Sequence, residues 1–255
     1  MTQKTSLTSF GTELFRTTED RFNNWRWQMK HQIQSLKDLE AIGFSDAGWI
    51  EGFSATEDIF KIGITPYYFA LMVMLKNSPG ARAIFQQAIP QKEERFDRLG
   101  KKDPLEEKGH SPVPEVVHLY PDRVAFCVAM LCPVYCRYCY RKRRDEEEGL
   151  HFNRAIIKRG IDYIRSNRAI RDVLITGGDP FITSDESLEY LLQELRSISH
   201  VEIVRFGTRT PVTLPYRITE KLVNILKQYH PIWLNTHFNC AEEITPEAEQ
   251  ALKLL

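Results

Sequence analysis

The spacing of apolar residues along the chain changes near residue 115. Before that point apolar residues recur at steps of three and four, the period of an amphipathic helix. The segment 18–42 has this pattern, with a break near Ser35. In "GITPYYFALMVML", Thr65 is a suitable N-cap and Pro66 a suitable first helical residue. We therefore expect residues 1–115 to form a helical region, with a linker in the Pro-, Gly- and charge-rich stretch 100–123.

After Arg123 the pattern changes to short apolar runs that alternate with amphipathic stretches. The expected strands are 123–131, 171–180, 201–211 and 231–239, and the expected helices are 156–167, 187–198, 217–229 and 245–255. This alternation predicts βα units and a parallel sheet in an α/β domain over residues 116–255. Four parallel strands leave an edge unpaired and a barrel unclosed. We therefore expect either a truncated sequence or another element that covers the edge.

Composition and charge narrow the class of protein. The 34 basic and 34 acidic residues cancel, so the net charge does not favour nucleic acid or a membrane surface as a partner. No apolar stretch is long enough to span a bilayer, and the N-terminus lacks the apolar core of a secretion signal. We expect a cytoplasmic protein, in which the five cysteines stay reduced.

Three of those cysteines lie close together in the sequence. Cys132, Cys136 and Cys139 have the spacing C-x3-C-x2-C, and a loop of this kind can wrap three thiolates around one centre. Structural zinc sites and iron–sulfur clusters both normally take four protein ligands. Three ligands on a four-iron cluster would leave one iron open for another molecule. The spacing alone leaves a cluster, zinc and unligated cysteines as alternatives.

The position of the cysteines favours a site over ordinary packing. They follow the first expected strand, and Gly177, Gly178 and Asp179 end the second, so both groups lie at the carboxyl edge where α/β folds place their sites. Glycines there let a ligand approach the backbone, although a plain β-to-α turn also uses them. The basic run 141–144 precedes "DEEE", which cancels its charge and argues against a nucleic-acid patch. Arg143 and Arg144 are expected to be solvated.

These residues together resemble the radical S-adenosylmethionine (SAM) superfamily. Its signature C-x3-C-x-aromatic-C is matched by Cys132, Cys136, Tyr138 and Cys139. The resemblance implies a partial (βα)6 barrel whose cysteines ligate a [4Fe–4S] cluster, with SAM on the fourth iron. By the same resemblance the SAM contacts are Tyr138, Gly177, Gly178, Asp179, Asn235 and His237.

Over nearly the whole chain the sequence resembles the lysine 2,3-aminomutase family. The similar stretches include "NNWRWQMKHQI", "YPDRV", "VYCRYCYRKRR", "DVLITGGDP", "EIVRFGTRTPVTLPYRIT" and "WLNTHFNCAEEIT". These enzymes move an α-amino group to the neighbouring carbon, using SAM to start the radical and pyridoxal phosphate (PLP) to carry the nitrogen. The resemblance implies that Arg141 binds the substrate carboxylate and that Arg123, with Tyr120 beside it, contacts the PLP phosphate.

The chain also departs from that family. Leu119 stands where a basic residue is expected, Cys240 replaces a histidine, and Tyr140 replaces threonine or phenylalanine. The family's PLP-binding lysine belongs to a glycine-rich segment expected beyond residue 255. No catalytic residue is therefore identified within the chain.

Our main hypothesis is the cluster- and SAM-binding part of an aminomutase for a free amino acid, lysine before glutamate or arginine. The alternatives are a lysine isomerase that serves elongation-factor modification, an inactive homologue that binds a cluster or a partner, and a zinc-binding module. The expected partners are the amino acid and a reductant protein such as flavodoxin or ferredoxin, with homo-oligomer formation left open.

Overall fold

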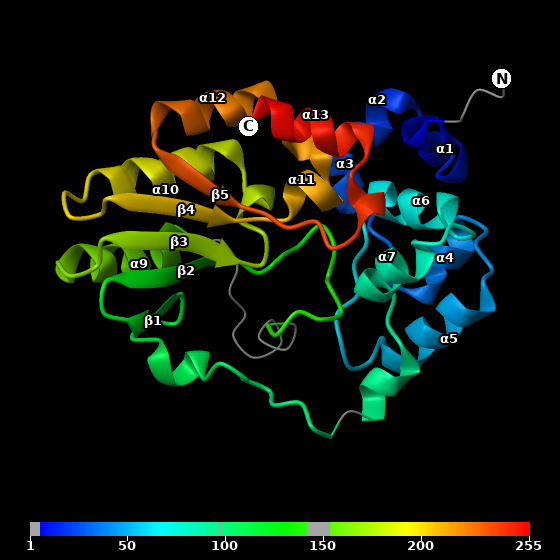
Figure 1. Ribbon diagram of the computed structural model, residues 1–255, viewed down its shortest axis with the longest axis horizontal. Coiled ribbons are helices and arrows are strands. Elements are labelled where there is room, and N and C mark those ends of the chain that lie inside the picture. Colours follow the sequence, from blue (N-terminus) through cyan, green and yellow to red (C-terminus); the bar gives the residue numbers. More distant parts are fainter. Residues whose placement is uncertain (1–5, 97, 142–153) are drawn as a thin grey trace.

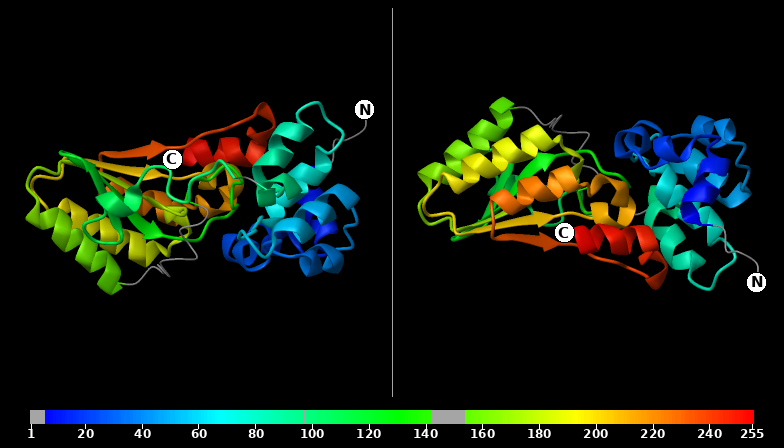
Figure 2. Two further views of the ribbon diagram at one scale, coloured as in Figure 1. Left: turned by 90° about the horizontal axis from the view of Figure 1, so that it is seen from below. Right: turned by 90° about the horizontal axis from the view of Figure 1, so that it is seen from above.

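The structure is a computed structural model that describes residues 6–96, 98–141 and 154–255. Figures 1 and 2 show two parts side by side, a helical N-terminal part and a sheet with its own helices. The chain is thus a mixed α/β protein, as predicted.

Short helices make up the N-terminal part. They are α1 (Leu7–Leu14), α2 (Glu19–Phe22), α3 (Trp25–Lys30), α4 (Leu36–Ala41), α5 (Ala47–Thr56), α6 (Pro66–Met74) and α7 (Ala81–Ala88), followed by the 3-10 helices η1 (Lys92–Phe96) and η2 (Glu107–His110). The predicted start of α6 is confirmed, because the Thr65 side chain accepts a hydrogen bond from the Tyr68 N–H and Pro66 is the first helical residue. The break near Ser35 is also confirmed, since Ser35 caps α4.

The segment 18–42 is more fragmented than its periodicity predicted. Asn24 accepts hydrogen bonds from Arg26 and Trp27 and so starts α3 afresh after α2. Ile33 then leaves the helix and pairs as a β-bridge with Ile64, at N···O distances of 2.8 and 3.1 Å. Side-chain capping and this long-range pairing therefore override a continuous helical pattern.

A five-stranded sheet forms the second part, in the order β1-β2-β3-β4-β5. Its strands are β1 (Val116–Tyr120), β2 (Arg123–Ala129), β3 (Asp172–Gly177), β4 (Ile203–Gly207) and β5 (Ile232–Asn235). The pairs from β2 to β5 are parallel, as predicted. The connecting elements are α9 (Arg154–Ser166), η3 (Pro180–Ile182), α10 (Asp185–Arg196), α11 (Thr210–Thr213), η4 (Pro215–Arg217) and α12 (Glu220–Gln228), and η5 (Ala241–Glu243) and α13 (Pro246–Leu254) follow β5.

The prediction of a plain linker over residues 100–123 was wrong. This stretch contains η2 and the strand β1, which pairs antiparallel with β2 and covers that edge of the parallel sheet. The alternating "VVHLY" lies between Pro114 and Pro121, and the turn residues on either side masked the strand signal.

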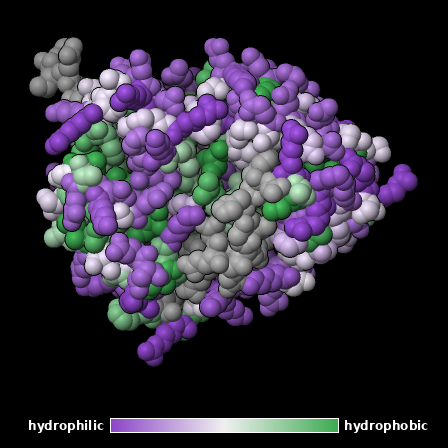
Figure 3. Space-filling view, turned by 180° about the vertical axis from the view of Figure 1, so that it is seen from behind, coloured by the Kyte–Doolittle hydropathy of each residue, from purple (hydrophilic) through white to green (hydrophobic). Residues whose placement is uncertain are grey.

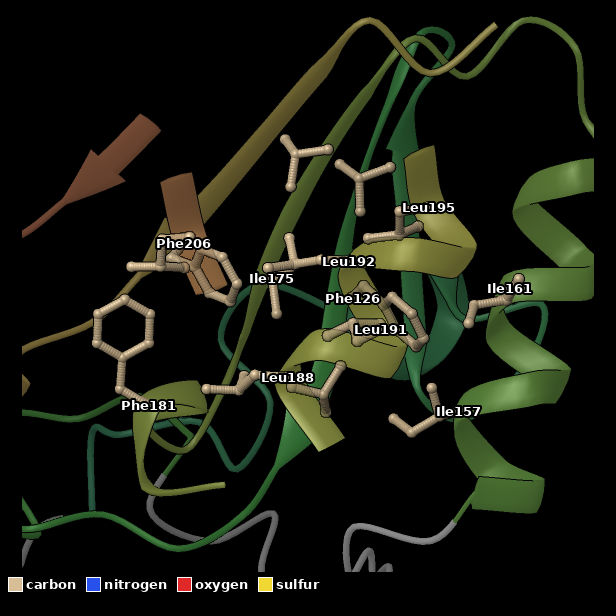
Figure 4. Close-up of a cluster of buried hydrophobic side chains, with 14 of the residues drawn as sticks. Phe126, Ile157, Ile161, Ile175, Phe181, Leu188, Leu191, Leu192, Leu195 and Phe206 are labelled. Carbon is tan, nitrogen blue, oxygen red and sulfur yellow. The ribbon is translucent and has the colours of Figure 1, made fainter. Parts of the chain in front are cut away.

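The main hydrophobic core lies between the sheet and one layer of helices. Phe126, Ile175 and Phe206 come from successive strands and are fully buried. Figure 4 shows Ile157 and Ile161 of α9, and four leucines of α10, directed toward these strand residues. Because helices pack against one face of the sheet, the strands and their carboxyl ends are fixed relative to one another.

A second core belongs to the helical part and extends onto the sheet part. It contains Phe22, Tyr67 and Phe69 together with Val134 and Val212 from beyond β2 and β4. The Tyr67 hydroxyl also lies 2.6 Å from Thr245 Oγ1 at the start of α13. The helical part is therefore packed against the carboxyl edge of the sheet.

Within the described residues, no helix is long and apolar enough to cross a membrane. On the face shown in Figure 3, hydrophobic residues are interspersed among hydrophilic ones.

Candidate functional site

The loop that carries Cys132, Cys136 and Cys139, called the cysteine loop below, follows β2 at the carboxyl edge of the sheet. Its backbone is held by the helical part. Val134 forms a β-bridge with Ile64, the residue that also pairs with Ile33. Thr65 N–H donates to the Pro133 carbonyl at 3.1 Å, and Tyr135 N–H donates to the Gly63 carbonyl at 2.9 Å. The loop is thus an added strand on the N-terminal backbone. This pairing fixes its path between Cys132 and Cys136.

Two polar side chains fasten the loop further. The Gln32 amide donates to the carbonyls of Cys132 and Pro133, at 2.8 and 2.9 Å. Arg137, which lies between the second and third cysteines, forms a two-pronged ion pair with Glu94, with N···O distances of 3.0 and 2.8 Å. Both partners are largely buried, so their geometry is constrained from both sides.

The glycines at the end of β3 serve an approach that the sequence did not reveal. Gly177 has a φ of +123°, and a Cβ there would meet the Ala129 carbonyl at under 3.0 Å. A Cβ on Gly178 would collide in the same way with the backbone of Met130 and Leu131. The absent side chains therefore let the ends of β2 and β3 come together. The expectation that they make room for a ligand remains a prediction.

The three cysteines, the two glycines and Arg141 line one cavity. The full lining is Met130, Cys132, Val134, Tyr135, Cys136, Cys139, Arg141, Gly177 and Gly178. Cys132, Cys136 and Cys139 are partly exposed, whereas Cys127 is buried within β2, and none of the four is in a disulfide. The structure thus brings together the predicted metal ligands and the predicted glycines.

The donor set, three thiols around one cavity, is chemically suited to a cluster. Among the described residues, no three His, Cys, Asp or Glu side chains are grouped so that they could hold one metal ion. A tetrahedral zinc draws all its ligands to about 2.0–2.3 Å from one centre. In a four-iron cluster each thiolate binds a different iron, so the thiolates need only surround a common cavity.

A buried arginine that the sequence analysis did not single out reaches one of the cysteines. Arg209, two residues past β4, donates from Nη1 to Cys136 Sγ at 2.9 Å. Its Nη2 donates to Glu243, to Gln87 Oε1 at 2.5 Å and to the Tyr68 hydroxyl at 3.2 Å. Burial opposes the charge, but Cys136, Tyr68 and Glu243 outweigh it and raise the pKa of Arg209. Arg209 is therefore a fixed cation beside the cysteine loop.

Arg141 is also held in place. Its guanidinium pairs with Glu107 of η2, with Nη2···Oε1 at 2.5 Å, and its Nη1 lies 3.4 Å from Thr176 Oγ1. Burial opposes its charge, but the neighbouring Cys127 and Glu107 outweigh it and raise the pKa of Arg141. The stretch expected to be a linker thus provides the carboxylate that orients a predicted substrate contact.

Tyr138, between the second and third cysteines, contacts His237, which lies two residues past β5. The Tyr138 hydroxyl shares a hydrogen bond of 3.1 Å with His237 Nε2 and accepts one of 2.7 Å from the Asn239 amide. Desolvation and the Arg209 charge lower the pKa of His237. Asn235 is exposed and ends β5 at the same edge.

Asp179 lies beside the site, but its carboxylate faces the protein. It is buried and accepts hydrogen bonds from the Phe181 N–H, the Arg209 N–H and the Thr208 hydroxyl, at 3.1, 2.8 and 2.6 Å. Desolvation raises the pKa of Asp179, although these hydrogen bonds oppose the shift. In this structure the side chain positions the turn that carries Arg209. Its predicted contact with SAM remains a prediction.

Tyr120 and Arg123 are not brought to the cysteine loop. They face each other across the turn between β1 and β2, and Arg123 is the first residue of β2, whereas the loop follows the last. Both are exposed, and Arg123 pairs with Asp122. Their assignment to a phosphate group remains a prediction. Arg143, Arg144 and "DEEE" lie outside the described residues.

Sequence reasoning missed Arg209, Glu243, Arg137 and Glu107. Arg209 and Glu243 belong to "GTRTP" and "CAEEIT", which follow the ends of two strands, the edge at which α/β proteins place ligand contacts. That position was the available signal for these two. Arg137 and Glu107 carried no signal of their own, because their importance comes from contacts between distant segments.

Comparisons with known proteins show which sequences the chain is similar to. Residues 128–250 match the model of the Radical SAM superfamily. The chain is 44% identical over 242 residues to an L-lysine 2,3-aminomutase of Methanococcus maripaludis, and the match covers 93% of this chain and 55% of that protein. It is 42% identical over 238 residues to the Bacillus subtilis L-lysine 2,3-aminomutase, covering 93% and 50%. A glutamate 2,3-aminomutase of Clostridioides difficile is 39% identical over 238 residues, covering 93% and 56%. The chain spans about half the length of these curated relatives.

Proposed function

Because the chain belongs to the lysine 2,3-aminomutase family of the radical SAM superfamily, we propose that it supplies the cluster- and SAM-binding part of an enzyme that moves the α-amino group of a free amino acid to the β-carbon. The observation that carries this proposal is the single cavity lined by Cys132, Cys136, Cys139, Gly177 and Gly178. We further propose that strands β2–β5 form the first part of a (βα)6 barrel.

Each residue of the site has a task in this proposal. The three thiolates would hold a [4Fe–4S] cluster and leave one iron for SAM. The cluster and SAM together would generate the radical, and PLP would carry the migrating nitrogen. Gly177, Gly178, Asn235 and His237 lie at the same edge and contribute the SAM contacts. Tyr138 stands beside His237. A reductant protein such as flavodoxin or ferredoxin supplies the electron.

Arg141 binds the substrate carboxylate. Its side chain lines the cysteine cavity, and Glu107 holds its guanidinium in one orientation. The guanidinium matches a carboxylate in a two-pronged, charge-assisted pair, and this residue type is preferred for such contacts. We propose lysine as the amino acid, because the relatives with 40–44% identity are named for lysine and the glutamate enzyme is 39% identical. Tyr120 and Arg123 are proposed as contacts to the PLP phosphate.

Anaerobic reconstitution tests the proposal. We expect about four irons and four sulfides per chain, and reductive cleavage of SAM to 5′-deoxyadenosine. Cys136→Ala should lose both, whereas Cys240→Ala, at a cysteine outside the cavity lining, should keep both. Stoichiometric zinc in place of iron would refute the cluster. A full cluster that never cleaves SAM would support an inactive homologue instead.

A further inference from the structure

Arg209 makes a contact that its role in packing does not explain. It is only 7% exposed, yet it directs one N–H group at the Cys136 sulfur, which lines the cysteine cavity. Its Nε–H is buried and has no hydrogen-bond partner among residues 6–96, 98–141 and 154–255. Native proteins rarely leave a buried donor unpaired, and the exceptions call for a functional explanation. The arginine is therefore poorly optimised as a purely structural group.

Side chains from three separate segments nevertheless hold this guanidinium in place. Tyr68 comes from α6, Gln87 from α7 and Glu243 from η5. Glu243 is fully buried and also accepts hydrogen bonds from the Tyr68 hydroxyl at 2.6 Å and the Asn239 N–H at 2.7 Å. A cation held this firmly keeps both its distance and its direction toward the sulfur. Arg209 and Glu243 thus form a fixed pair of opposite charges, with the positive member against the cysteine.

We infer that Arg209 is a positioning residue that raises the reduction potential of the cluster held by Cys136, and that Glu243 moderates this effect. The inference rests on the proposed function, since it requires a bound cluster. Reduction adds one electron from the reductant protein to the cluster and breaks no bond. Hydrogen bonds to the ligand sulfurs and nearby charge are among the features that set such potentials. An N–H donor with a positive charge stabilises the more negative, reduced cluster.

The two charges predict shifts of opposite sign. Arg209→Gln removes the cation but keeps an amide of similar reach, so the potential should fall. Glu243→Gln removes the anion and leaves Arg209 uncompensated, so the potential should rise. We expect each change to alter the ratio of reduced to oxidised cluster at a fixed potential about tenfold, which corresponds to about 59 mV for one electron. Damage to the fold would not produce opposite signs.

Arg205 provides a matched control in β4, the strand that leads to Arg209. It lies in β4, four residues before Arg209, and pairs with Asp172 at an Nε···Oδ1 distance of 2.9 Å. It is not one of the residues that line the cysteine cavity. Arg205→Gln therefore removes a positive charge from β4 without touching the cysteine loop, and the potential should stay unchanged.

The experiment is a redox titration of the reconstituted full chain, followed by electron paramagnetic resonance, for the wild type and the three variants. Iron content is measured first, so absence of a cluster from the wild type would overturn the proposed function itself. With clusters present, opposite shifts in Arg209→Gln and Glu243→Gln support the inference. Equal potentials, or shifts in the same direction, overturn it. If Arg209→Gln binds no iron, Arg209→Lys takes its place in the titration and the decision rests on Glu243→Gln. Glu243→Gln must then raise the reduction potential, and an unchanged potential in this variant overturns the inference.

Discussion

Replacing Gly177 with alanine should severely destabilise the protein, for two reasons that can be separated. At φ +123° an L side chain is strained, which costs about 2 kcal/mol. The new Cβ would also lie under 3.0 Å from the Ala129 carbonyl, an atom of the backbone that cannot rotate away. Overpacking of this kind costs about 2 kcal/mol more. We therefore expect Gly177→Ala to lower the free energy of unfolding by about 4 kcal/mol, a large part of the typical 5–15 kcal/mol.

Two other glycines serve as controls for these contributions. Gly43 also has a positive φ, +72°, but no atom lies within 4 Å of its Cβ position, so Gly43→Ala isolates the conformational strain. Gly109 has an ordinary φ and the same empty surroundings, so Gly109→Ala should be nearly neutral. Urea unfolding followed by circular dichroism measures all three variants. If Gly177→Ala and Gly43→Ala lose the same free energy, the close approach of β2 and β3 is not what requires Gly177.

Three further predictions concern the cysteine loop and its surroundings. Arg137→Gln removes the two-pronged ion pair with the largely buried Glu94 and should cost about 3 kcal/mol in urea unfolding, whereas the double variant with Glu94→Gln should recover part of that loss; additive losses would contradict the coupling. Arg141→Ala should retain the iron but weaken lysine binding at least tenfold by isothermal titration calorimetry, and unchanged affinity would remove its carboxylate role. Burial and then Glu243 raise the pKa of Cys240 to about 11, so its alkylation by iodoacetamide, which needs the thiolate, should reach half its maximal rate near pH 11; a midpoint at pH 8.5 would contradict this.

Local signals predicted the elements that local chemistry determines. Thr65 and Pro66 mark the start of α6 because capping depends on neighbouring residues alone. The βα rhythm after Arg123 located β2 to β5, since their apolar residues are buried on a parallel sheet. The strand β1 escaped because prolines flank it and its partner β2 comes later in the chain. The fragmentation of the segment 18–42 escaped for a similar reason, since the pairing of Ile33 with Ile64 is not visible in local periodicity.

The site shows the same division. The spacing of Cys132, Cys136 and Cys139 singled out three cysteines that the fold does bring to one cavity, because thiols this close in the sequence can surround a common centre. Arg209 and Arg137 are single arginines in ordinary sequence, and only the folded chain shows that one points at a cysteine sulfur and the other ties the loop to Glu94. Residues whose function depends on a distant partner therefore remained hidden.

The pairing of the cysteine loop with residues 63–65 has a consequence for the order of events on the ribosome. The N-terminal segment that receives the loop is synthesised before Cys132 emerges, and it contains both Ile64 and its bridge partner Ile33. Chains fold in this N-to-C order during synthesis. We expect the cysteine loop to pair with the backbone of residues 63–65 in the nascent helical part as the loop leaves the exit tunnel.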